Sequence, residues 1–235
     1  MYVKKSKLNF LHSFWSVVSF GGVWRITIIA IYTFILHAYF FGSLGIDADF
    51  NVFVGMIRRP LFDNQPTFPV NIVPFSYIIA GIALTLEQPS RFLLKQNSVE
   101  YVRQRRGVAH YMRYLGTIIA YGVAVSALQV FLSLTISDVT DVCGLIVGAY
   151  AATWTLIVYL LLMNVTIMIN QRYIGYALVF FAHSVVCGAS AVQHYLLSNI
   201  SILGAAFPVW SIVLVILSVG LILINYAVLQ NIDIM

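Results

Sequence analysis

The sequence predicts an all-α membrane protein, with one transmembrane domain of six helices over residues 1–235. The composition, the apolar runs and the placement of Lys and Arg all support this fold class. Hydrophobic residues make up 61% of the chain, charged residues only 9%, and the mean hydropathy is +0.92. Soluble domains carry about 25% charged residues, so this chain has too few charges to cover a surface that faces water.

Six apolar segments are long enough to be membrane-spanning helices. A helix needs roughly 20 apolar residues to cross the hydrocarbon core. The segments without Asp, Glu, Lys or Arg are 26–46, 68–86, 114–137, 142–169, 173–190 and 207–230. Pro69 and Pro74 lie early in the second segment, where proline fits a first turn or kinks a helix. The apolar region from Tyr173 to Gln230 is too long for two straight crossings, so we expect part of it to form a re-entrant hairpin.

The positive residues set the orientation, because Lys and Arg concentrate in cytoplasmic loops. With the N-terminus inside, eleven of the 13 Lys and Arg residues face the cytoplasm, and only Arg58 and Arg59 lie outside. The sequence therefore predicts a multi-pass protein of the cell membrane with both termini in the cytoplasm.

The segment 1–25 is predicted to be an interfacial amphipathic helix. Apolar residues recur there at helical spacing behind three lysines, namely Leu8, Leu11, Phe14, Trp15 and Val18. This pattern is typical of a helix that lies at headgroup depth and contacts membrane lipids.

The six segments argue against several functions. An intramembrane charge costs about 2.5 kcal/mol or more, and ion-coupled transporters usually retain one for function. These segments contain none, and the chain has no GxSG, HExxH or GxxxxGK[ST] motif. We therefore expect no enzyme activity, no catalytic residue and no cofactor in this chain. Any uphill transport would take its energy from a separate subunit.

Few side chains in the segments suggest a specific site. His37, His183 and His194 have no His or carboxylate at i+3 or i+4, so we expect polar contacts between helices rather than metal ligands. Gly144 and Gly148 form a GxxxG pattern in the fourth segment. Small residues at this spacing let helix backbones approach closely, either within the chain or in a dimer.

The loop 87–113 holds the densest positive charge of the chain. Asn97 with Glu100 resembles a capping box, which predicts a short amphipathic helix at the membrane surface. Its arginines have two interpretations. They set topology and contact lipid phosphates, at about 1 kcal/mol each, or they form a docking surface for a soluble partner. No nucleic-acid binding is expected, because no stacking platform or recognition fold accompanies the charge.

Several stretches together resemble a known family. They are the amphipathic segment before the first span, the proline entry "FPVNIVPFSYIIAG", the basic "LLKQNSVEYVRQR" and the closing "LINYAVLQNIDIM". In these the chain resembles the permease subunits of ABC type-2 exporters, which occur with separate ATPases in bacterial peptide and antibiotic systems. The resemblance implies a re-entrant helical hairpin between spans five and six. It also implies a second permease, identical or homologous, and a cytoplasmic ATPase subunit that holds ATP and Mg.

In the family that the chain resembles, the loop at this place in the sequence is a coupling helix that contacts the ATPase. The resemblance therefore implies the same role for the basic loop. The residues it assigns are Ser98, Glu100, Tyr101, Arg103, Arg105 and Arg106. The function it implies is ATP-driven export of an amphipathic peptide or a lipid-like cargo. Two alternatives stay open: the substrate-capture membrane subunit of an ATP-driven vitamin importer, and a non-transport immunity or assembly protein.

Overall fold

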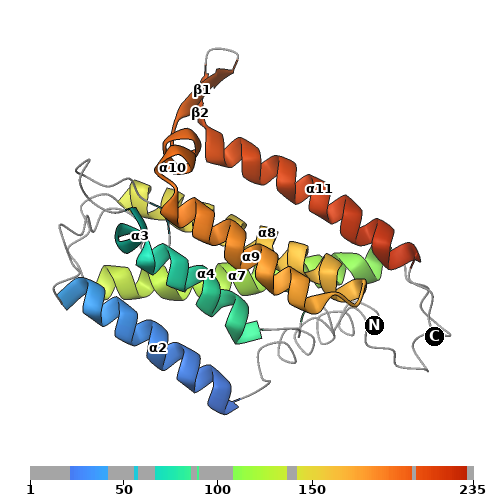
Figure 1. Ribbon diagram of the computed structural model, residues 1–235, viewed down its shortest axis with the longest axis horizontal. Helices are drawn as coiled ribbons and strands as arrows, with labels where there is room; N and C mark the ends of the chain where they lie inside the picture. Colours follow the sequence, from blue (N-terminus) through green and yellow to red (C-terminus); the bar gives the residue numbers. More distant parts are fainter. Residues whose placement is uncertain are drawn as a thin grey trace, which may run out of the picture.

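The computed structural model describes residues 22–41, 56–57, 67–85, 89, 108–136, 142–202 and 205–231. These residues are mostly helical and form an elongated bundle with a small projection at one end (Figure 1). The elements are α2 (Gly22–Phe41), α3 (Thr67–Val70), α4 (Ile72–Thr85), α7 (Val108–Ile136), α8 (Val142–Met168), α9 (Arg172–Gly188), α10 (Ser190–Leu196), β1 (Asn199–Ile202), β2 (Ala205–Pro208) and α11 (Val209–Asn231).

The helices have the length and composition of a membrane protein. Three of those described are long and apolar enough to cross a bilayer: Val108–Phe131 of α7, Val142–Met168 and Val209–Asn231. The pair α9 and α10, bent by 85°, would make a fourth if it forms one span. Val23–Ala38 and Ile72–Thr85 are shorter apolar helices. The helical class is thus confirmed, and the apolar helices are consistent with a membrane-embedded protein. Each of the six predicted segments overlaps a described helix.

The helix starts differ from the predicted ones at two places. α2 begins at Gly22, so residues 22–25 belong to the first apolar helix, and the predicted interfacial segment 1–21 lies outside the described residues. Trp24 Nε1 and Arg25 Nε donate to the carbonyls of Ala83 and Leu84, at 3.3 and 3.1 Å. These bonds satisfy last-turn carbonyls of α4 and hold α2 against it. α7 begins at Val108, so the end of the basic loop is helical.

Helix α8 is the centre of the bundle and packs against α4, α7, α9 and α11. Its Leu156 and Leu161 are completely buried, and Gly148, Ala151 and Ala152 are buried as well. Lipid is as apolar as leucine, so helices in a bilayer associate through close packing and hydrogen bonds rather than through the hydrophobic effect. The small residues of α8 allow that close packing.

Buried hydroxyl groups join α4, α7 and α8. Tyr77 and Ser126 hydroxyls lie 2.6 Å apart, and the Thr153 hydroxyl lies 2.5 Å from that of Ser126. Tyr121 donates to the carbonyl of Gly81 at 2.5 Å. Polar side chains in a bilayer have no water to bond, so such contacts fix which helix faces meet.

The turn between α8 and α9 brings the two helices into close contact at Gly175. Asn170 has a φ of 61°, and the amide of Gln171 donates to the carbonyl of Thr166 at 2.7 Å. This turn folds α9 back along α8 so closely that a Cβ on Gly175 would collide with Oγ1 of Thr166. Only a residue without a side chain fits there.

The region between α9 and α11 differs from a purely helical hairpin. α10 is followed by an antiparallel hairpin in which Ile200 pairs with Phe207 and Ser201 with Ala206. These strands form the projection in Figure 1. β-Branched and aromatic residues favour extended backbone, and Pro208, which has no N–H to donate, stands at the end of β2. The described residues therefore contain two strands besides the helices.

Candidate functional site

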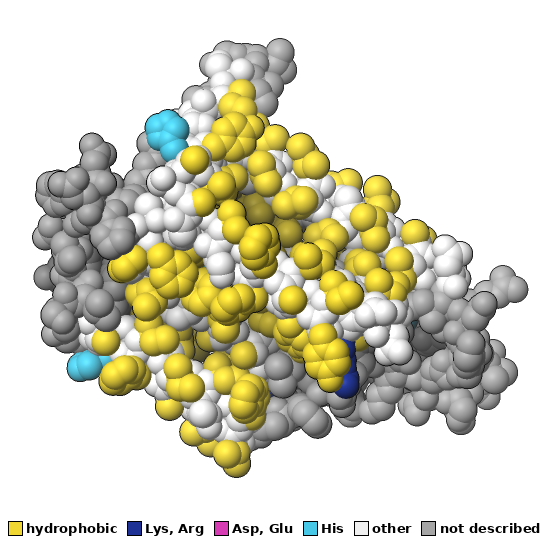
Figure 2. Space-filling view, in the orientation of Figure 1, with side chains coloured by type: hydrophobic (Ala, Val, Ile, Leu, Met, Phe, Trp, Pro, Cys, Tyr) yellow, Lys and Arg dark blue, Asp and Glu magenta, His cyan; other side chains and the backbone are white. Residues whose placement is uncertain are grey.

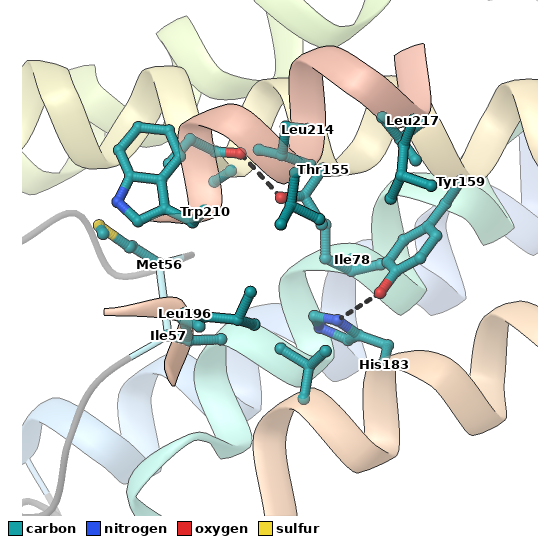
Figure 3. Close-up of a pocket in the computed structure, with 15 residues that line it drawn as sticks. Met56, Ile57, Ile78, Thr155, Tyr159, His183, Leu196, Trp210, Leu214 and Leu217 are labelled. Carbon is teal, nitrogen blue, oxygen red and sulfur yellow. Dashed lines mark hydrogen bonds between the residues drawn. The ribbon is translucent and has the colours of Figure 1, made fainter. Parts of the chain in front are cut away.

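Residues of α4, α8, α9, α10 and α11, together with Met56 and Ile57, line an apolar cavity of about 130 Å³ that is open on one side (Figure 3). Ala151, Ala152 and Thr155 of α8 contribute to its lining, and Trp210, Leu214 and Leu217 of α11 form one wall. The facing side includes Ile78 of α4, His183 and Val186 of α9, and Leu196 of α10.

The break in α9 shapes one end of this cavity. α9 ends at Gly188, Ala189 is extended, and α10 leaves at 85°. The side-chain amide of Gln193 donates to the carbonyls of Val186 and Cys187, at 3.1 and 2.8 Å. Carbonyls freed at a helix end need such partners when they are buried. The bend places Leu196 of α10 among the lining residues.

His183 is the most polar side chain of the lining, and it contacts two other helices. Its Nδ1 lies 3.4 Å from the hydroxyl of Tyr159 on α8, and its Nε2 lies 3.3 Å from the carbonyl of Pro74 on α4. The ring stacks on Phe75 at 5.7 Å between centroids. A neutral imidazole with its proton on Nε2 satisfies both polar contacts. The predicted interhelical role of His183 is thus confirmed.

Cys187 adds a contact that the sequence did not single out. Its Sγ lies 3.6 Å from Nε2 of His183, one helical turn away. The signal was the His-x₃-Cys spacing, which puts both side chains on one helix face. Among the described residues there is no group of three or more His, Cys, Asp and Glu side chains that could hold a metal ion. The pair therefore packs beside the cavity without forming a recognisable metal centre.

The polar groups around the cavity, apart from the indole N–H of Trp210, are bonded within the protein. Thr155 donates to the carbonyl of Ala151 at 2.8 Å, and the Tyr159 hydroxyl faces His183 (Figure 3). The remaining lining is almost entirely aliphatic or aromatic. A polar ligand would lose its hydration without gaining partners, whereas an apolar ligand would lose nothing. The cavity is therefore suited to an apolar group.

A second cavity, of about 180 Å³, lies between α8 and α11 and shares Trp210 and Leu214 with the first. Tyr150 and Trp154 line it together with Trp210, and the Tyr150 ring lies 6.1 and 6.4 Å from the other two between centroids. Trp and Tyr concentrate at the membrane–water interface. The first turns of α11 thus lie between the two cavities, and the three aromatic rings lie beside them.

The residues assigned by sequence lie elsewhere. The coupling-helix residues Ser98, Glu100, Tyr101, Arg103, Arg105 and Arg106 fall outside the described residues. Gly144 is half-buried and Gly148 is buried in the first turns of α8, and their role in a helix or dimer interface stays a prediction. His37 and His194 are exposed.

Comparisons of the chain with protein-family models, with characterised proteins and with solved structures gave no match.

Proposed function

We propose that this chain is the transmembrane permease subunit of an ATP-driven exporter, and that its cargo is an amphipathic peptide or a lipid-like molecule. The observation that carries the proposal is an apolar cavity inside a bundle whose described helices hold charge only near their ends, at Arg25, Arg113 and Arg172. Such a bundle offers a path for apolar groups and no charged group for ion coupling.

The full topology forms part of this proposal. In it α2, the pair α3–α4, α7, α8, α9 and α11 are six crossings, with both termini in the cytoplasm. The segment 189–208, with the bent α10 and the strand pair, would be the re-entrant element between the fifth and sixth crossings. The excess of Lys and Arg at one set of helix ends supports the orientation.

Energy would enter through the basic loop between α4 and α7. The chain has no P-loop, so a cytoplasmic ATPase subunit would bind ATP and Mg. The segment from Ser98 to Arg106 would be the coupling helix that rests on this subunit. The bonds from Trp24 and Arg25 to the end of α4 support the start of that loop, so motion of the loop would pass to two helices.

A vitamin importer fits the cavity less well. A site that captures a vitamin needs convergent polar groups that remain free to bind the ligand. Here Thr155, Tyr159 and His183 are already bonded within the protein.

A triple substitution tests the proposal. Arg103, Arg105 and Arg106 changed together to Ala should abolish cargo-stimulated ATPase activity in the reconstituted complex, because charge-assisted contacts to the ATPase are lost. Arg58 and Arg59 changed to Ala serve as the control, since they are predicted to lie on the outer side. The chain should still insert and purify in both variants. Normal stimulation and normal recovery of the complex in the triple variant would refute the coupling role.

A further inference from the structure

We propose that the cavity beside His183 binds a single alkyl chain of a membrane amphiphile, which enters sideways from the bilayer between α9 and α11. The inference rests on the proposed function only in that the amphiphile represents the class of cargo that the exporter would carry. The binding step itself needs no ATPase.

The cavity opens between α9 and α11. α9 and α11 both pack on α8, and Figure 2 shows the surface hollowed between them. The lining residues on its two sides are apolar: Val186 of α9 is half-buried, and Leu217 of α11 is 45% exposed. Leu217 faces lipid in a membrane-embedded helix, so the cavity continues the lipid-facing surface.

The chemistry of the lining matches a hydrocarbon chain. The lining offers methyl, methylene and aromatic surface, and the polar groups of Thr155, Tyr159 and His183 bond to protein partners. None of the hydrogen bonds made by the described residues involves the indole N–H of Trp210, at the start of α11. A lipid headgroup beside Trp210 could accept a hydrogen bond from this N–H, while the cavity itself would hold only the hydrocarbon chain.

The volume of the cavity limits the length of alkyl chain that it can hold. Apolar cavities of about 150 Å³ stay dry and accept a ligand as large as benzene. The cavity here is about 130 Å³, so it holds a short segment of alkyl chain rather than a whole lipid. The neighbouring space of about 180 Å³ lies directly beyond Trp210 and Leu214. Rotation of these two side chains would join the spaces and admit a longer part of the chain.

The experiment measures quenching of Trp210 fluorescence by dibrominated lysophosphatidylcholine, with the purified chain in nanodiscs of unbrominated phosphatidylcholine. The protein keeps Trp210 alone, with Trp15, Trp24 and Trp154 changed to Phe. We expect quenching that saturates and that is reversed by the unbrominated lysolipid. Quenching that rises linearly with the mole fraction of brominated lipid would overturn the proposal.

A cavity-filling variant provides the matched comparison. Ala151→Leu adds volume to the lining, and Ala127→Leu adds the same volume at an exposed position of α7. Ala151→Leu should weaken the saturable component about tenfold, since space for roughly two methylenes is lost, and Ala127→Leu should leave it unchanged. Equal effects of the two substitutions would contradict the site.

A second variant covers the case in which the single-tryptophan protein does not fold. Trp154→Phe and Trp210→Phe together in the otherwise unaltered chain should remove the saturable component, because these are the tryptophans that line the two cavities. Retention of that component would overturn the proposal. If the chain copurifies with an ATPase but shows no saturable alkyl binding, this inference is wrong and the proposed function is unaffected. If the chain binds the alkyl chain but has no ATPase partner, the proposed function is wrong and this inference is unaffected.

Discussion

Replacing Asn225 with Ala should weaken the contact between α8 and α11. Asn225 is completely buried; it accepts from Asn164 Nδ2 at 2.6 Å and donates to the carbonyl of Leu161 at 3.0 Å. Both bonds cross between the helices. A hydrogen bond between helices in a bilayer contributes about 0.6 kcal/mol on average and at most about 1.7 kcal/mol. Two such bonds give a loss of about 1–3 kcal/mol in the free energy of unfolding.

The double-mutant cycle isolates the pair. With Asn225 removed, the side-chain amide of Asn164 keeps only a 3.8 Å contact to the sulfur of Met168. Asn164→Ala should therefore cost much less in the Asn225→Ala background than in the wild type, by about 0.6–1.7 kcal/mol. The assay is unfolding by SDS titration in mixed micelles, followed by far-ultraviolet circular dichroism.

Ser218→Ala is the control on the same helix. Ser218 is buried, but its hydroxyl donates to the carbonyl of Leu214 in α11 itself. Its loss should change stability by less than about 0.5 kcal/mol. The reasoning is refuted if Asn164→Ala and Asn225→Ala add within about 0.3 kcal/mol, or if Ser218→Ala costs as much as either.

Two further substitutions test the packing of the bundle. Gly175→Ala should destabilise by about 1–3 kcal/mol, because its Cβ would collide with Thr166, whereas Gly220→Ala should be neutral or stabilising, since nothing lies within 4 Å. Equal unfolding midpoints for these two variants would contradict the close approach of α8 and α9. Tyr77→Phe should cost about 0.5–1.5 kcal/mol in the same titration, through loss of the bond to Ser126. An unchanged midpoint would show that this bond does not hold α4 against α7.

The helices were the part of the fold most open to prediction from sequence. The predicted segment 142–169 agrees with α8 because Asp141 precedes the apolar run, and Asn170, with its positive φ, ends it. These boundaries depend on local residue chemistry. The predicted first segment starts too late, because a segment without charge has to begin after Arg25, whereas Arg25 lies inside α2 and donates to a carbonyl of α4.

The β1–β2 hairpin and the cavity beside His183 could not be predicted from the sequence. A short apolar run such as that around Ile200 and Phe207 has no length or period that separates strand from helix. The cavity depends on the bend after α9 and on how α11 lies across α8, which are properties of tertiary packing. His183 could be assigned a contact between helices, but neither Pro74 nor Tyr159 could be named as its partner.

The central claim is that this chain works with a separate ATPase, and copurification tests it most directly. The tagged full-length chain is extracted from its native membrane in mild detergent, and the complex is analysed by size-exclusion chromatography and mass spectrometry. The account predicts a soluble ATPase in equal number to the permease chains, which the Arg103, Arg105 and Arg106 triple variant loses. Recovery of the wild-type chain without an ATPase, under conditions that preserve a known exporter complex, would contradict it.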